Sequence, residues 1–300
     1  MQKVSVGPKQ PPELTNAVRE AGADLVELED AEVLVWFGGG ASRLSEALDR
    51  APRLRWVQLP LAGIESVVDV LRPELTWVCA KGVYGPVVAE HGLALMLAAA
   101  RGIHRYARRS SWAPEPGRTL SGTNALLLGG GGITGALTGL LAPLGVRMTV
   151  VRKHLRPMPG VDVTIGPGDL PRAIGTADWV VVAWALTPET ERAVDAAFME
   201  RMRPDAWLIN LGRGRHVHTD DLVAALREGA IGGAALDVTD PEPLPDDHPL
   251  WSLENALVTP HVANHWEIGL PLLAERLREN LRRDRDGEPL LGLVDVSLGY

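Results

Sequence analysis

Residues 126–135 read LLLGGGGITG, an apolar run that meets four consecutive glycines, with a fifth glycine three positions later. Gly130, Gly132 and Gly135 fit the pattern G-x-G-x-x-G, which on its own is often only a turn or a linker. The residues on either side decide whether this stretch is a linker or a dinucleotide-binding turn. An apolar run over 125–128 precedes it, a helical pattern over 133–143 follows it, and a second apolar run covers 146–151. This strand–turn–helix–strand order favours a dinucleotide-binding turn, in which a pyrophosphate lies at the helix N-terminus.

The rest of the chain shows the same alternation of strands and helices. The strand candidates are continuous apolar runs, which is typical of a parallel sheet with helices on both faces. In the second half we expect strands over 178–184, 206–210, 233–238 and 255–259, and helices over 198–202 and 219–227. In the first part we expect strands over 4–6, 25–28, 33–37 and 56–59, and helices over 12–21 and 44–51.

Two longer helices, expected over 87–106 and 268–283, connect these two parts. The sequence therefore predicts an α/β protein of two doubly wound domains. A Rossmann dinucleotide-binding domain, residues 93–265, is inserted in a smaller flavodoxin-like substrate domain, residues 1–92 plus 266–300. The length of 300 residues agrees with two domains at about 150 residues each.

Composition excludes several classes of protein. The net charge of −8 argues against a nucleic-acid partner, which usually requires a basic surface. The single cysteine, Cys79, excludes a disulfide framework and indicates a reducing, cytoplasmic setting. The apolar stretch at 91–101 is about half the ~20 residues that a membrane span needs, so no membrane association is expected. His216 and His218 lack a clear third ligand, so no metal site is expected.

Three polar side chains follow expected strands in the second half of the chain. Arg213 lies just beyond the strand at 206–210, Glu242 in a Pro-rich loop after 233–238, and His261 just after 255–259. Ligands of open α/β sheets bind outside the carboxyl ends of the strands, so these side chains are expected at the ligand site. Each one alone could equally be a surface or core residue; together, behind a dinucleotide turn, they indicate catalysis.

These three residue types suit the reduction of a 2-keto acid. A guanidinium can hold the substrate carboxylate and polarise the keto oxygen. An imidazole can deliver a proton to that oxygen while hydride reaches the carbon. A carboxylate beside the imidazole would favour its protonated form and fix its orientation. We therefore expect Arg213, Glu242 and His261 to form the catalytic set.

The chain resembles the D-isomer-specific 2-hydroxyacid dehydrogenases over nearly its whole length. The resemblance rests on INLGRG, ALDVTDPEPLP and VTPHVA around the three polar residues, and on LTPETERAV at 186–194. It is supported by VVAEHGLALMLAAAR at 87–101, by PLAGIES at 60–66 and by the ending VDVSLGY. Two positions depart from the family pattern. Gly131 replaces a bulkier residue in the turn, and His218 stands where an acidic residue is common.

The resemblance implies a role for each matching residue. Arg213 would bind the substrate carboxylate and carbonyl, His261 would act as acid and base, and Glu242 would be its partner. The backbone at Ala62 and Gly63 would bind the substrate carboxylate. The implied cofactor contacts come from the glycine turn, the end of the next strand, the loop at 186–194 and the nicotinamide region: Gly130, Gly132, Ile133, Thr134, Gly135, Arg152, Lys153, Leu186, Thr187, Leu211, Gly212 and Asp237.

The residues after the second strand of the dinucleotide motif indicate which cofactor is used. In NAD-binding folds an Asp or Glu near this point binds the ribose 2′-hydroxyl, ~20 residues after the fingerprint. Here Arg152 and Lys153 occupy the position, and the first carboxylate is Asp162. A guanidinium can bind a 2′-phosphate, so we expect NADP(H) to be preferred, with NAD(H) possible. The alternative is that the basic cluster is a solvated turn and that Asp162 or another acid folds back to the ribose.

The leading interpretation is a D-stereospecific reductase of a small 2-keto acid of the glyoxylate or hydroxypyruvate type. One alternative is an NAD(P)-sensing binding protein resembling the corepressors that share this fold, although such proteins usually carry extra interaction tails. Another is a formate or phosphonate dehydrogenase. The resemblance also implies a homodimer.

Overall fold

The computed structural model describes residues 1–114 and 116–296. The chain divides into two compact units, one of residues 1–84 together with the chain from His265 onward, the other of residues 85–264. These limits describe which residues pack into each compact unit. The boundaries of the substrate domain and of the dinucleotide-binding domain stay a prediction.

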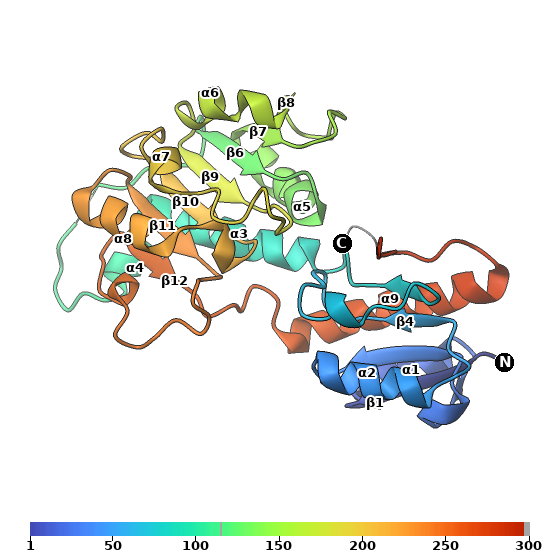
Figure 1. Ribbon diagram of the computed structural model, residues 1–300. Helices are drawn as coiled ribbons and strands as arrows, with labels where there is room; N and C mark the ends of the chain where they lie inside the picture. Colours follow the sequence, from blue (N-terminus) through green and yellow to red (C-terminus); the bar gives the residue numbers. More distant parts are fainter. Residues whose placement is uncertain (115, 297–300) are drawn as a thin grey trace. The chain divides into compact units, whose positions relative to one another are not determined.

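The larger unit contains a seven-stranded sheet in which every strand pair is parallel, in the order β12-β11-β10-β9-β6-β7-β8 (Figure 1). Taken from β8 to β11, this is the strand order 3-2-1-4-5-6 of the Rossmann fold, extended by β12. The order reverses between β6 and β9, where such sheets bind ligands. The strands are β6 (Asn124–Leu128), β7 (Arg147–Val151), β8 (Val163–Ile165), β9 (Trp179–Val182), β10 (Trp207–Asn210), β11 (Gly233–Leu236) and β12 (Ala256–Val258).

Successive side chains of each central strand enter two different cores. Leu126 and Leu128 of β6 belong to one buried cluster, whereas Ala125 and Leu127 belong to another. Both faces of the sheet are covered, which explains why these strands are continuous apolar runs in the sequence. The helices of this unit are α3 (Gly85–Arg101), α4 (Ile103–Tyr106), α5 (Gly132–Leu141), α6 (Leu170–Ile174), α7 (Ala196–Met199) and α8 (Thr219–Glu228), with short 3₁₀ turns η3 (Ala142–Leu144), η4 (Pro167–Asp169), η5 (Gly214–His216) and η6 (Pro249–Trp251).

The smaller unit has a five-stranded parallel sheet in the order β2-β1-β3-β4-β5. This is the flavodoxin-like order 2-1-3-4-5, so the predicted pair of doubly wound folds is confirmed. Its elements are β1 (Lys3–Pro8), α1 (Pro12–Glu20), β2 (Asp24–Leu25), η1 (Leu28–Asp30), β3 (Val33–Phe37), α2 (Ala41–Arg50), β4 (Trp56–Gln58), η2 (Val68–Val70), β5 (Thr76–Val78) and α9 (Trp266–Asp286).

Helix α9 is attached to this sheet by a fully buried amide. Asn280 donates from Nδ2 to Oε1 of Gln58 on β4 over 3.1 Å. The same side chain accepts from the N–H of Leu291 over 2.8 Å and donates to its carbonyl oxygen over 3.1 Å. The C-terminal helix and the segment after it therefore belong to the first unit, although they are remote from it in sequence.

The structure differs from the expected elements at a few places. The helix expected over 87–106 ends at Arg101, because Gly102 takes a left-handed φ of 63° before α4 begins. The strand expected over 25–28 is shorter, since only Asp24–Leu25 pairs with β1 before η1 starts. Strand β5 and helix α6 were not expected; both are only a few residues long and carry too little periodicity to identify.

Within the described residues, no helix combines the length and the apolar character that a membrane crossing requires.

Candidate active site

The glycine turn joins strand β6 to helix α5. Gly129 has a left-handed φ of 114°, and a Cβ at this position would lie 2.6 Å from the carbonyl oxygen of Ala183. The buried side chain of Thr134 donates from Oγ1 to the carbonyl oxygen of Gly129 over 2.8 Å, which ties the first helical turn to the strand end. Because the pattern G-x-G-x-x-G starts at Gly130, it leaves out Gly129, the glycine whose conformation the turn requires.

The N-terminus of α5 suits a diphosphate. The first N–H groups of a helix have no carbonyl partner inside it, so Gly132, Ile133 and Thr134 present donors at this end. Gly135 is the first whose N–H donates back, to the carbonyl oxygen of Gly131 over 3.0 Å. Together with the positive end of the helix dipole, this arrangement stabilises bound phosphate oxygens.

Arg152 lies directly over the glycine turn. It follows the last residue of β7, and its N–H donates to the carbonyl oxygen of Ile165 over 3.0 Å. A Cβ on Gly130 would lie 2.9 Å from its Nε, so the guanidinium stem packs against that glycine. Lys153 is the next residue and is exposed. The structure therefore brings a guanidinium to the turn that presents the phosphate-binding donors.

Asp162 lies at the opposite end of the same strand. Its Oδ2 accepts from the N–H of Met148, the second residue of β7, over 2.7 Å, and its own N–H donates to the Met148 carbonyl oxygen over 3.1 Å. Ligands bind at the carboxyl ends of the strands, whereas these bonds hold Asp162 near the amino end. The carboxylate is therefore occupied in a structural role away from Arg152.

The loop after β9 forms a compact turn. The hydroxyl of Thr190 accepts from the N–H of Thr187 over 2.9 Å and donates to the carbonyl oxygen of Ala185 over 2.7 Å. Leu186 and Thr187 are both partly exposed at the carboxyl end of the strand. The loop thus has a fixed shape on the sheet edge that also carries the glycine turn.

Arg213 follows β10 in a closely bonded loop. Asn210, fully buried at the end of the strand, donates to the Arg213 carbonyl oxygen over 2.9 Å and accepts from the N–H of Gly212 over 3.1 Å. The guanidinium of Arg213 donates to the carbonyl oxygen of Gly212 over 2.9 Å. Gly214 lies so close to Thr239 that a Cβ on Gly214 would overlap the carbonyl oxygen of Thr239. Leu211 is buried, and the loop as a whole has little freedom.

Asp237 is the anchor of the segment that carries His261. Its Oδ1 accepts from the hydroxyl of Thr259 over 2.6 Å and from the N–H of Val262 over 3.0 Å, and its Oδ2 accepts from the N–H of Ala263 over 3.0 Å. Its side chain is buried. The carboxylate therefore shapes the 259–263 turn. From the sequence, Asp237 was expected only to contact the nicotinamide, and this structural function was not predicted.

A histidine on α3 completes this network. The Nε2 of His91 lies 3.0 Å from the Thr259 hydroxyl oxygen and 3.4 Å from Oδ1 of Asp237. Burial alone would raise the pKa of the Asp237 carboxyl, but hydrogen bonds from His91, Thr259 and the two backbone N–H groups lower that pKa below its ordinary 3.8. The carboxylate is thus held in its charged form by its partners. Neither His91 nor Thr259 was singled out from the sequence.

His261 and Glu242 are brought together as predicted from their chemistry. Nδ1 of His261 lies 2.5 Å from Oε1 of Glu242, and the two side chains are 49% and 42% exposed. His261 has a left-handed φ of 53°, and its N–H donates to the carbonyl oxygen of Asp237 over 2.8 Å. With Nδ1 directed at the carboxylate, Nε2 is the ring nitrogen left to face a ligand.

The three polar residues share one edge of the sheet. Arg213 follows β10, Glu242 follows β11 and His261 follows β12, and these are neighbouring parallel strands. This edge therefore carries a guanidinium, an imidazole and its carboxylate partner, and the same edge holds the glycine turn after β6. Within the described residues no group of three or more His, Cys, Asp and Glu side chains could hold a metal ion.

The loop expected to bind the substrate carboxylate belongs to the smaller unit. The hydroxyl of Tyr84 donates to the carbonyl oxygen of Pro60 over 2.6 Å, and the Cys79 thiol to that of Ala62 over 3.5 Å. The N–H of Ala80 donates to the carbonyl oxygen of Leu61 over 2.9 Å. Burial raises the pKa of both the Tyr84 hydroxyl and the Cys79 thiol, so both remain protonated donors. These bonds hold the carbonyl side of the Ala62–Gly63 loop.

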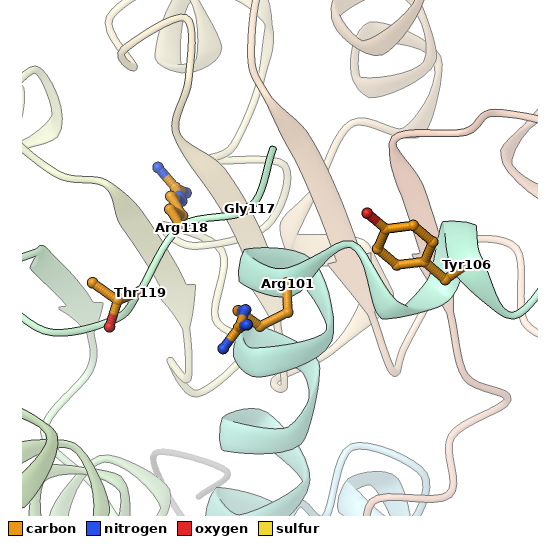
Figure 2. A pocket seen from close by; sticks show the side chains of 5 residues that line it. All are labelled: Arg101, Tyr106, Gly117, Arg118 and Thr119. Carbon is orange, nitrogen blue, oxygen red and sulfur yellow. The ribbon is translucent and has the colours of Figure 1, made fainter. Parts of the chain in front are cut away.

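A pocket of about 410 Å³ lies away from the sheet edge that carries Arg213 and His261 (Figure 2). Arg101 and Tyr106 line it from α3 and α4, and Gly117, Arg118 and Thr119 from the following segment. Arg118 donates to the carbonyl oxygen of Asp178, the residue before β9, and so lies at the amino end of the sheet. Ligands of this fold bind at the other end, so we do not assign catalysis to this pocket.

Comparison with known proteins identifies the family of the chain. Residues 93–263 match the family described as D-isomer specific 2-hydroxyacid dehydrogenase, NAD binding domain. An uncharacterized protein in the proB 3′ region of Corynebacterium melassecola is 38% identical over 96% of this chain and 97% of its own length. The human glyoxylate reductase/hydroxypyruvate reductase is 34% identical, over 60% of this chain and 56% of that enzyme.

A solved structure shows the same architecture. The D-isomer specific 2-hydroxyacid dehydrogenase from Xanthobacter autotrophicus Py2, in complex with NADPH and MES, superposes with a TM-score of 0.86. It is 27% identical in sequence, and the match covers 100% of this chain and 99% of that one.

We expect Asp237→Asn to lower the free energy of unfolding by about 1–3 kcal/mol at pH 7, because an amide nitrogen cannot accept the backbone N–H groups that the carboxylate satisfies. A lowered native pKa gives stability that is present above the ordinary pKa and lost as the pH falls through the native one. The difference from the wild type should therefore shrink below pH 3.8. Urea unfolding between pH 3 and pH 8 measures it.

The exposed Asp247 provides the control, since Asp247→Asn should leave the unfolding curve unchanged. Equal stability of Asp237→Asn and the wild type at pH 7 would contradict the anchoring role of this carboxylate.

Proposed function

Because the chain belongs to the D-isomer specific 2-hydroxyacid dehydrogenase family, whose members are NAD(P)-dependent oxidoreductases, we propose that it reduces a small 2-keto acid to the D-2-hydroxy acid. The substrate class we favour is the glyoxylate or hydroxypyruvate type, in keeping with the name of its human relative. The observation that carries the proposal is the His261–Glu242 pair, which lies on the sheet edge that also holds Arg213 and the glycine turn.

The cofactor residues fit a nicotinamide dinucleotide. The N–H groups at the start of α5, from Gly132 to Thr134, would hold the diphosphate, with Gly130 and Gly135 in the same turn. Leu186 and Thr187 of the β9 loop, and Leu211, Gly212 and Asp237 on the neighbouring strand ends, would border the nicotinamide end. When bound, the reduced nicotinamide supplies the hydride.

The protein side chains then account for the rest of the reaction. Arg213 holds the substrate carboxylate and polarises the keto oxygen. The family resemblance suggests the backbone N–H groups at Ala62 and Gly63 as a further contact for a substrate carboxylate. His261, protonated and paired through Nδ1 with Glu242, gives its Nε2 proton to the keto oxygen as hydride forms the new C–H bond. The products are the 2-hydroxy acid and the oxidised cofactor. The neutral imidazole then recovers a proton from solvent.

We expect His261→Ala and Arg213→Ala each to lower kcat/KM for the best 2-keto acid by at least ~10²–10⁴-fold, the usual contribution of a general acid. Arg213→Ala should also raise KM markedly, because it removes substrate anchoring. Glu242→Gln should also lower kcat/KM, because a neutral amide replaces the carboxylate that orients the imidazole through Nδ1. Steady-state assays over a panel of 2-keto acids measure all three.

The matched control is Arg215→Ala. Arg215 lies two residues from Arg213, but its exposed guanidinium pairs with Glu191, so activity should stay near that of the wild type. Near-normal kcat for His261→Ala would rule out the mechanism. Absence of turnover in the wild type, combined with tight nucleotide binding, would instead favour a sensing protein.

We further propose that NADP(H) is preferred over NAD(H). Arg152 packs against Gly130, Lys153 follows it, and the nearest downstream carboxylate, Asp162, is bonded to the far end of β7. A guanidinium at this position can form charge-assisted, bidentate bonds to a 2′-phosphate. The Xanthobacter autotrophicus structure was obtained with NADPH, which supports this choice.

Two charge-assisted bonds, discounted for exposure, predict at least about tenfold selectivity for NADPH, equivalent to ~1.4 kcal/mol. Arg152→Asp should abolish or reverse it, because a carboxylate repels the phosphate and accepts the free ribose hydroxyls. The measurement is kcat/KM for both cofactors. Arg172→Asp, an exposed change on α6, should leave the ratio unchanged. Equal values in the wild type would overturn the assignment.

Finally, we propose a homodimer, as the family suggests. Sedimentation at micromolar concentration should give twice the mass of one chain, and a monomer there would contradict the proposal. The cytoplasmic setting stays a prediction that rests on the single cysteine.

A further inference from the structure

His216 is a fully buried histidine three residues after Arg213, at the end of the short turn η5. Histidine is seldom completely buried, and a buried imidazole needs hydrogen-bond partners for its ring nitrogens. The mechanism proposed above uses no group on this side chain. Its position directly under the Arg213 loop calls for a physical reason.

The imidazole is bonded to the backbone of Arg213. Nδ1 of His216 lies 3.0 Å from the Arg213 nitrogen and 3.1 Å from the Arg213 carbonyl oxygen. That oxygen already accepts from Nδ2 of Asn210 over 2.9 Å and from the N–H of His216 over 3.2 Å, which uses both of its lone pairs. Nδ1 is therefore the acceptor of the Arg213 N–H.

The ring fits because of the glycine next to Arg213. A Cβ on Gly212 would lie 2.9 Å from both Cε1 and Nδ1 of His216. The ring of Trp184 packs edge-on against the imidazole, with centroids 6.4 Å apart. The imidazole thus packs between Gly212 and Trp184, with Nδ1 directed at the Arg213 peptide.

The backbone of η5 is itself tied to another loop of the site. The carbonyl oxygen of His216 accepts from the N–H of Val194 over 3.0 Å, and that of Arg215 from the N–H of Arg192 over 2.7 Å. Val194 ends the segment that began at Leu186. Asn210 fixes the other side of the loop, through the Gly212 N–H and the Arg213 carbonyl oxygen. The remaining backbone group, the Arg213 N–H, is bound by Nδ1 of His216.

We propose that His216 is a positioning residue for Arg213: its imidazole orients the peptide that aims the guanidinium at the carboxylate of a 2-keto acid. The inference rests on the proposed role of Arg213. It concerns substrate binding and the aligned keto oxygen, and it gives His216 no part in binding the nucleotide. A misplacement of about 1 Å at a reacting group can cost ~10²-fold in rate.

Three substitutions of His216 test whether the position of the acceptor atom matters or only its presence. His216→Leu removes the acceptor. His216→Asn places Oδ1 about where Nδ1 lies, whereas His216→Gln carries its amide one bond further out. We expect His216→Leu and His216→Gln to lower kcat/KM for the 2-keto acid ~10–100-fold, largely through KM. His216→Asn should recover most of the loss. The dissociation constant of NADPH, measured by fluorescence, should stay within about twofold in all three.

His104 is the matched control. It too is a buried histidine bonded to backbone, and its ring packs on Trp207 at the amino end of the strand that carries Asn210 at its carboxyl end. His104→Leu should lower Tm without changing KM for the 2-keto acid. If His216→Leu does not fold, the comparison of the Asn and Gln variants still decides.

Each result has a definite meaning. An active wild type with unchanged KM in His216→Leu overturns this inference and leaves the proposed function standing. Equal losses in the Asn and Gln variants, in step with a loss of Tm, also overturn it, because they indicate a structural role only. A wild type that reduces no 2-keto acid with either cofactor overturns the proposed function and this inference with it.

Discussion

The structure depends on one constraint: in a parallel sheet buried on both faces, polar chemistry can appear only where the strands end. Strands β6, β9, β10 and β11 bury their side chains almost completely in the two cores. Strand direction then places every carboxyl end at the same edge. The glycine turn, the Arg213 loop and the His261 segment are therefore neighbours although about 130 residues separate the first from the last.

Loops at such an edge need internal support, because the sheet fixes only their first residue. Here the support comes from buried polar side chains that bond backbone groups. Asn210 holds the Arg213 loop, Asp237 holds the 259–263 turn, and Thr134 holds the glycine turn. Each is 3% exposed or less, so its bonds are shielded from water and leaving one partner unsatisfied is costly. The exposed His261 is positioned through the bonds that Asp237 makes to its segment.

The parts of the fold that follow from one-dimensional pattern could be predicted. Apolar runs such as 179–182 identify central strands, and the strand that precedes glycines and a helix identifies the dinucleotide turn. What could not be predicted depends on contacts across the sheet. Gly102 ends a helix in the middle of a periodic pattern, and Gly129 needs its left-handed backbone because Ala183 lies against it. Likewise, nothing near His91 in sequence indicates Asp237, which is 146 residues away.

The two charged groups near β7 show why spacing alone left the cofactor open. Both Arg152 and Asp162 lie at a sequence distance from the glycine turn at which a residue could contact the ribose of a nucleotide. The strand separates them, because Arg152 follows its carboxyl end and Asp162 is bonded to Met148 near its amino end. A five-residue strand rises about 3.3 Å per residue, so the two sites lie on the order of 10 Å apart along β7. A solvated carboxylate could swing back toward the ribose, but this one would first have to give up the Met148 N–H. The charged group that lies against Gly130 is therefore the guanidinium of Arg152.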